Sequence, residues 1–267
     1  MTTELTQNNE TSMTHGDYLG AENILPEDFI IPKLFLMQGQ SKFVAERKAG
    51  LGDIVRSTTA EKVGDPESPL KIIPLTFKNL WLLEEKVKGS DKKLYRGVLT
   101  RDSGMHDGGK SEIEKTGTRL PFQFQHEGQE WVRTKTVDVF CLLSQDLAPT
   151  TVQLDDDLPD LSKTVMPVLL RFKGTSFLAG AKVVTHFSVA AQSRSKPHYY
   201  QLDVTCKLVE NDKGTFYIFD DARYSGPVPK EKRAETDRWY QVVTSQKVKV
   251  DESEDQTVEA PASKEEY

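Results

Sequence analysis

Cysteine is nearly absent from this chain: its 267 residues include only Cys141 and Cys206, which form no Cys-x-x-Cys pair. The five histidines show neither His-x-His nor His-Glu-x-x-His spacing, so the usual zinc motifs are missing. No run of about 18 apolar residues occurs, which excludes a transmembrane helix. The first residues lack the basic and apolar segments of a signal peptide. We therefore expect two buried free thiols in a reducing cytoplasm, with no metal or other cofactor.

Basic residues are missing from residues 1–32, which carry six acidic side chains. Residues 251–267 carry seven acids and one base, and their net charge of −6 equals that of the whole chain. Residues 33–250 hold 34 basic and 28 acidic residues, a net charge of +6. A mildly basic body with acidic ends favours a polyanionic partner, and the acidic ends can compete for the same surface.

Catalytic motifs are also scarce. The acidic run Asp155–Asp160 has the oxygen ligands that Mg²⁺ or Ca²⁺ prefers, but it lacks EF-hand spacing. Gly174-Thr175-Ser176 does not match the Gly-x-Ser-x-Gly spacing of a nucleophile elbow. We therefore expect no catalytic residue and no enzyme. A metal-dependent nuclease that uses the acidic run is the least favoured alternative.

Strand patterns dominate the centre of the chain. Apolar runs predict strands near residues 52–56, 70–77, 80–83, 94–100, 131–143 and 165–172, and an extended edge segment over 29–38 that Pro32 interrupts. Alternation from Tyr200 to Leu208, a turn at 211–214 and a return run at 215–219 predict a β-hairpin. We expect residues 102–118 and 155–160 to be loops.

Two helices are expected. An apolar stripe of Phe177, Ala181, Val184, Phe187 and Ala191 predicts a helix over 175–191, capped by Thr175 or Ser176. Gly180 in this helix can permit close packing on a sheet. Pro229 is suited to open a terminal helix, with Trp239, Val242 and Val243 as its apolar anchor.

These elements predict a mainly β protein with a few helices. We expect an OB-like (oligonucleotide-binding) Greek-key barrel, in which one helix lies between the third and fourth of five strands. The strand count exceeds five, so extra strands or a second small sheet are expected. The predicted parts are a disordered acidic arm (1–23), the OB-like nucleic-acid-binding domain (24–228), a C-terminal helix (229–248) and a disordered acidic tail (249–267).

Basic and aromatic side chains are interleaved along the predicted strands, which suits single-stranded nucleic acid because phosphates need positive charge and unpaired bases stack on rings. The candidate binding residues are Lys42, Arg47, Lys48, Trp81, Lys92, Lys93, Tyr95, Arg96, Trp131, Arg133, Lys135, Arg171, Lys173, Arg194, Lys196 and Tyr199. Trp81, Tyr95, Trp131 and Tyr199 are the expected stacking residues, and Arg194–Tyr200 is the sharpest local candidate. The same pattern is also normal on half-buried strands. DNA and RNA are not distinguished by it.

The last residues, Ala262-Ser263-Lys264-Glu265-Glu266-Tyr267, are acids closed by an aromatic side chain. This ending resembles the tails of bacteriophage single-stranded-DNA-binding proteins, which often close with Phe rather than Tyr. Pro32–Gly39, Gly52–Val55 and Phe172–Phe177 with the hairpin after them also look like a phage protein family. The similar segments together touch most of residues 29–223.

The resemblance implies a non-enzymatic protein of the host-cell cytoplasm that coats and protects single-stranded DNA in phage replication or recombination. It implies that the tail occupies the basic groove without DNA and recruits polymerase, helicase or primase when DNA displaces it. The tail residues are Asp251, Glu252, Glu254, Asp255, Glu265, Glu266 and Tyr267. A homo-oligomer is compatible with this reading, and no membrane contact is expected. The alternative from another class is a phage structural or assembly protein without nucleic-acid binding.

Overall fold

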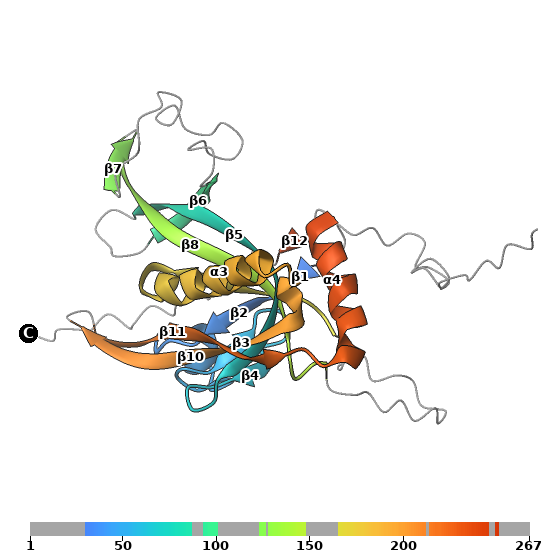
Figure 1. Cartoon of the computed structure of the whole chain (residues 1–267). Helices are drawn as coiled ribbons and strands as arrows, with labels where there is room; N and C mark the ends of the chain where they lie inside the picture. Colours follow the sequence, from blue (N-terminus) through green and yellow to red (C-terminus); the bar gives the residue numbers. More distant parts are fainter. Residues whose placement is uncertain are drawn as a thin grey trace, which may run out of the picture.

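The computed structural model describes residues 30–86, 93–100, 123–126, 128–147, 165–211, 214–245 and 249–250 (Figure 1). Its strands are β1 (Ile30–Ile31), β2 (Lys33–Leu36), β3 (Ile54–Arg56), β4 (Lys62–Gly64), β5 (Leu70–Lys86), β6 (Lys93–Thr100), β7 (Gln123–His126), β8 (Gln129–Leu143), β9 (Val168–Lys173), β10 (Tyr200–Asn211), β11 (Gly214–Pro227) and β12 (Lys249–Val250). Its helices are α1 (Lys42–Ala45), α3 (Phe177–Gln192) and α4 (Arg233–Ser245), with 3-10 turns at Gly174–Ser176, Pro197–Tyr199 and Lys230–Lys232. The prediction of a mainly β protein with a few helices is confirmed.

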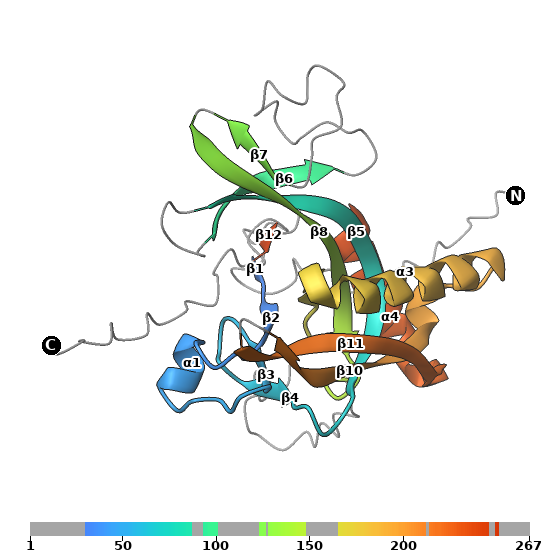
Figure 2. The ribbon, with the colours of Figure 1, turned by 90° about the vertical axis from the view of Figure 1, so that its left-hand side faces the viewer.

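Ten strands form one sheet in the order β11-β10-β5-β8-β9-β2-β3-β4, with β6 beside β5 and β7 beside β8. β5 and β8 run antiparallel along most of their length, from Ile72 opposite Leu143 to Glu85 opposite Trp131. Their outer halves, flanked by β6 and β7, form an arm that rises away from the other strands (Figures 1 and 2). We define the arm as β6, β7, the part of β5 from Leu80 onward and the part of β8 up to Thr136.

The prediction of two separate strands at 70–77 and 80–83 is wrong, because β5 is continuous through both. A register shift between Pro74 and Thr76 interrupts its pairing with β8, and Figure 2 shows β5 bending between the body and the arm. A bulge tolerates proline, which has no N–H to donate to the ladder. β5 therefore continues through the irregularity at Pro74.

Helices cover both faces of the central strands. Val137, Val139 and Cys141 of β8 share one core cluster with Val183 of α3. Phe140, between two of these residues, belongs to a second cluster that includes Trp239 and Val243 of α4. Successive strand residues point to opposite faces, so α3 and α4 lie on opposite faces of the sheet. The predicted face of Val137, Val139, Cys141 and Leu143 and the anchor of the terminal helix are confirmed.

The helix expected over 175–191 is confirmed as α3, and Gly180 explains how closely it approaches the sheet. A Cβ at Gly180 would lie 2.6 Å from the Cβ of Phe172 and 2.9 Å from the Cβ of Val137. Ser176 is the N-cap residue, one of the two predicted, but its hydroxyl makes no capping hydrogen bond and instead accepts the backbone N–H of Phe219. The predicted stripe is partly correct, since Phe177, Val184 and Phe187 contact the core whereas Ala191 is exposed.

The extended segment near 29–38 is confirmed, but its place at a sheet edge is wrong. Pro32 separates β1 from β2, and β2 lies inside the sheet between β9 and β3. β1 instead pairs in parallel with β12, Ile31 opposite Val250, in a second small sheet of the expected kind. Lys249 and Val250, which we expected in the disordered tail, are therefore part of a strand. Residues 1–29 and 251–267, including every tail residue named above, lie outside the described residues.

The β10–β11 hairpin is confirmed and extends to Pro227. The sheet curls so far that the β11 edge meets the segment after β2. The side-chain amide of Gln38 bridges the two: its oxygen accepts the Tyr217 N–H at 3.0 Å, and its nitrogen donates to the Tyr217 carbonyl at 2.9 Å. The sheet is therefore a curled half-barrel in which the side chain of Gln38 joins the β11 edge to the segment after β2.

Both cysteines are free thiols, Cys141 buried as expected and Cys206 only partly buried. Burial raises the pKa of the Cys206 thiol to about 12, so it stays protonated at neutral pH. Within the described ranges no helix has the length and apolar character needed to cross a membrane.

Candidate nucleic-acid interface

A cluster of rings and cations lies where the arm meets α3. Trp81 of β5 stands opposite Lys135 of β8, and the Arg133 guanidinium carbon lies 4.3 Å from the centre of the Trp81 ring. The Lys135 ammonium is 5.4 Å from the Trp81 ring and 5.8 Å from the Phe177 ring. Both distances are within cation–π range. We call Trp81, Arg133, Lys135 and Phe177 the arm cluster.

The members of the arm cluster differ in exposure. Lys135 is exposed, Trp81 and Phe177 are half-buried, and Arg133 is only 8% exposed. Lys135 can thus meet a phosphate while the two rings offer faces to bases. Arg133 lies mostly beneath the surface, so its contact with Trp81 orients that ring. Trp81, Arg133 and Lys135 were each predicted as binding residues, and the structure brings the three together, with Arg133 mostly buried beneath the surface.

The other candidates on the arm lie further out. Trp131 stacks on Phe124 of β7 with 6.5 Å between the ring centres and 13° between the planes. Tyr95 of β6 is in register with Glu84 of β5. The side chains of Lys93, Tyr95 and Arg96 and the whole of Lys92 lie outside the described residues.

A pocket of about 390 Å³ opens where β2, β9 and β11 diverge, and we call it the seam pocket. One part of its lining is cationic and comprises Lys33, Arg171 and Lys173. Another part is aromatic and comprises Phe35, Phe216, Tyr217 and Phe219, and Gln38, Thr175 and Ser176 add polar groups. Such a combination can hold a negatively charged group beside a flat ring.

The cations of the seam pocket are backed by buried carboxylates. Arg171 donates two hydrogen bonds of 2.7 Å to Asp138, and the Lys173 ammonium lies 3.5 Å from Glu84. Asp138 and Glu84 are 5% and 8% exposed, whereas the Lys173 side chain is 56% exposed. The described residues that line the pocket include neither carboxylate. The cations therefore face the pocket, and the carboxylates that pair with them lie buried beneath.

The seam pocket and the arm cluster border one another. Lys173 pairs with Thr136, the residue after Lys135, and the turn Gly174–Ser176 leads directly to Phe177. The first turn of α3 holds no acidic residue, and Ser176 does not cap it. The positive end of the α3 dipole adds to the charge of this surface. Arg171 and Lys173 pair with Asp138 and Thr136, which alternate along β8 with Lys135, so they lie on the other face of the sheet from Trp81 and Lys135.

The segment Arg194–Tyr200 is not the open binding loop that we predicted. Asp237 of α4 accepts hydrogen bonds from Lys196 at 2.9 Å and from the Tyr199 hydroxyl at 2.7 Å, and it pairs with His198 at 2.7 Å. Burial alone would raise the pKa of the Asp237 carboxyl, but these hydrogen bonds lower it to about 2. Burial lowers the pKa of His198. The segment anchors α4, and this role was missed because Asp237 is distant in sequence.

The candidates on α1 and after α3 are exposed but separate from the arm cluster. Lys42 and Lys48 both pair with Glu46, at 3.9 and 2.7 Å. Arg47 and Arg194 each take a positive φ at the end of a helix. The observed contacts do not connect these four cations with Trp81 or Lys135 among the described residues.

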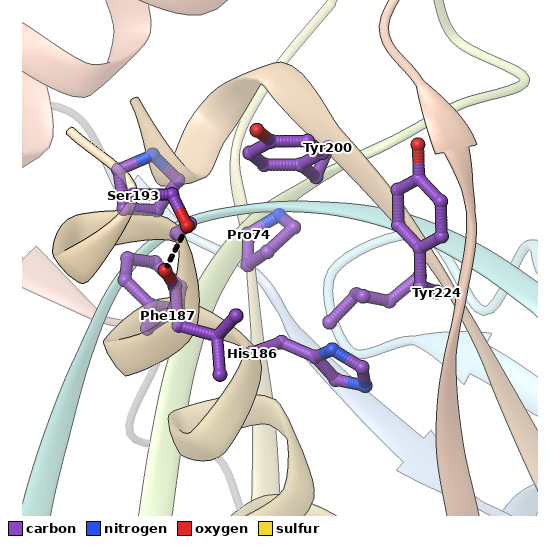
Figure 3. A pocket seen from close by; sticks show the side chains of 10 residues that line it. Pro74, His186, Phe187, Ser193, Tyr200 and Tyr224 are labelled. Atoms are coloured by element: carbon purple, nitrogen blue, oxygen red, sulfur yellow. Dashed lines mark hydrogen bonds between the residues drawn. The ribbon is translucent and has the colours of Figure 1, made fainter. Parts of the chain in front are cut away.

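A second pocket, of about 280 Å³, lies between α3 and the β10–β11 hairpin. Figure 3 shows Tyr200 and Tyr224 along one side, Phe187 and Ser193 on the other, and Pro74 between them. Its lining includes no Lys or Arg, so it suits an apolar group and not a phosphate. Sequence reasoning missed it because its residues come from four separate segments.

In the part of the chain that the structure describes, no group of three or more His, Cys, Asp or Glu side chains is placed to hold an ion. The acidic run at 155–160 lies outside that part.

Comparison with known proteins gives one match. A family model described as "Pam3 phage gp34-like protein" matches residues 3–249, which is most of the chain. No curated protein and no solved structure matches it significantly.

Proposed function

The chain belongs to the Pam3 phage gp34-like family, and on this premise we propose that it is a non-enzymatic protein that binds and coats single-stranded DNA in phage replication or recombination. It would act in the cytoplasm of the infected host. The observation that carries the proposal is the arm cluster, in which the exposed Lys135 lies within 6 Å of the rings of Trp81 and Phe177. Phosphate and base can be contacted together there, and each stacked base contributes about 1–3 kcal/mol.

The strand pairing supports an OB-like barrel. β5 pairs with β8 and β10, β8 also pairs with β9, and β10 pairs with β11. α3 lies between β9 and β10, as the helix of an OB fold lies between its third and fourth strands. OB proteins bind nucleic acid on the face of strands two and three and between two loops. The corresponding parts here are β8 and β9, the arm and the turn between β10 and β11.

The acidic tail would compete with DNA for this surface and recruit replication proteins once DNA displaces it. Val250 pairs with Ile31, only two residues before Lys33 of the seam pocket. The described part of the chain therefore ends two residues along the strand segment from this cation. Flexible carboxylates near Lys and Arg compete with phosphates most strongly at low salt.

A titration with a fluorescent oligo-dT strand and a matched duplex, at low and moderate salt, tests the proposal. We expect tight, salt-sensitive binding to the single strand and weak binding to the duplex. Absence of binding, also after removal of residues 251–267, would refute the proposal. The second candidate, a phage structural or assembly protein, would then be favoured, because the apolar pocket beside Tyr200 and Tyr224 suits a protein contact.

A further inference from the structure

We propose that the seam pocket is a nucleotide subsite, which holds the phosphate and the base of one nucleotide apart from the arm cluster. This inference rests on the proposed function and specifies how the strand is held. It predicts that the pocket binds a single nucleotide that is too short to reach the arm cluster.

The lining separates two kinds of contact. Arg171 and Lys173 come from β9, whereas Phe216 and Tyr217 come from β11 on the other side of the gap between the strands. A nucleotide has the same division, with a charged phosphate at one end and a flat base at the other. The volume of about 390 Å³ is of the size of small-ligand pockets, and an aromatic wall with few convergent polar groups is typical of them.

The phosphate end is favoured by fixed charge. Lys173 stands at the surface above the buried Glu84, so an incoming anion meets the ammonium first. Gly174, between the lining residues Lys173 and Thr175, has a φ of 57° and open space where a Cβ would stand, so a phosphate can approach the backbone. The α3 N-terminus, which follows this turn, is without an acidic residue in its first turn and favours negative charge.

The base end is favoured by rings that the fold holds still. Both the N–H and the carbonyl of Tyr217 are bonded to Gln38, and a Cβ on Gly52 would lie 2.8 Å from the Tyr217 ring. A ring fixed in this way loses little conformational entropy when a base packs against it. The neighbouring Phe216 is half-buried and adds apolar surface.

The test uses the full chain at low salt and compares thymidine 5′-monophosphate with thymidine and inorganic phosphate, by ligand-observed NMR titration. We expect the monophosphate to bind more tightly than either fragment. Lys173→Ala should weaken its binding roughly three- to fivefold, the effect of one partly exposed charge pair. Lys207→Ala is the matched control, since Lys207 is 53% exposed and also pairs with an acid, Asp220.

Phe216→Leu tests the base end, because it keeps an apolar side chain and removes the ring. It should also weaken binding of the monophosphate. Equal binding of phosphate and monophosphate would reduce the pocket to an anion site and overturn the inference. It would also be overturned if oligo-dT binds while the monophosphate does not, or if Lys173→Ala and Lys207→Ala behave alike. In these cases the proposed function stands, since only loss of oligo-dT binding refutes it.

Discussion

Replacement of Trp81 by alanine is the most direct test of the arm cluster. Trp81 contributes no charge, and its ring lies 4.3 Å from the Arg133 guanidinium and 5.4 Å from the Lys135 ammonium. The substitution therefore removes a stacking surface while it leaves both cations in the chain. Its effect on DNA binding separates stacking from charge neutralisation.

The expected magnitude follows from the stacking of one base. A loss of about 1–3 kcal/mol corresponds to binding weakened roughly 5- to 150-fold. The slope of log K against log salt should not change, because no phosphate contact is lost. Lys135→Ala should instead change the salt dependence: the magnitude of the slope should fall by about one, because one phosphate loses its cation.

Fluorescence anisotropy with labelled oligo-dT at four or more salt concentrations measures both quantities. Trp81→Phe keeps a ring and should restore most of the affinity. Tyr224→Ala is the control, since Tyr224 is a 52% exposed ring outside the proposed surface. Circular dichroism melting checks that each variant is folded. The reasoning is refuted if Trp81→Ala binds like the native protein, or if Tyr224→Ala loses as much affinity.

Three further outcomes are expected. Gly180→Ala should destabilise the protein by about 1–3 kcal/mol through overpacking, partly offset by a gain in helix propensity of about 1 kcal/mol, whereas the exposed Thr185→Ala should have little effect on the melting temperature. The hydrogen bond from Lys182 lowers the pKa of Asp221 to about 2. The Asp221 carboxylate therefore stabilises the fold above about pH 4 and loses this effect as the pH falls toward 2. The melting temperature of Asp221→Asn should approach that of the native protein as the pH falls over that range. Removal of residues 251–267 should tighten oligo-dT binding at low salt more than at high salt, and equal affinity in both proteins would remove the self-screening role of the tail.

Local patterns predicted the elements that carry their own periodicity. The alternation of Val137, Val139 and Cys141 predicted β8, and Trp239 with Val243 predicted the buried stripe of α4, because these spacings follow directly from strand and helix geometry. Gly180 was also interpreted correctly, since a glycine inside a helix usually has a packing reason. These features depend on neighbours within a few residues.

Contacts between distant segments were not predicted. Gln38 bonds to Tyr217, 179 residues away, and β2 pairs with β9, which puts β2 inside the sheet rather than at its edge. Two strands were expected at 70–77 and 80–83, but the continuous pairing of β5 with β8 from Thr76 to Glu85 makes them one strand. Tyr199 and Lys196 are a ring and a cation, like members of the arm cluster, yet both donate hydrogen bonds to Asp237.

The amino-acid sequence by itself determined the class of this protein: a mainly β body of positive charge between acidic ends, with rings and cations interleaved on its strands. Composition and short-range spacing are enough to predict these features, because net charge is a sum over residues and strand patterns depend on the spacing of near neighbours. Only the tertiary structure decided which cations and rings meet. The register of β5 on β8 joins Trp81 to Lys135, and the turn after β9 brings Phe177 to Lys135, because strand pairing and helix packing, not sequence distance, decide which side chains share a surface.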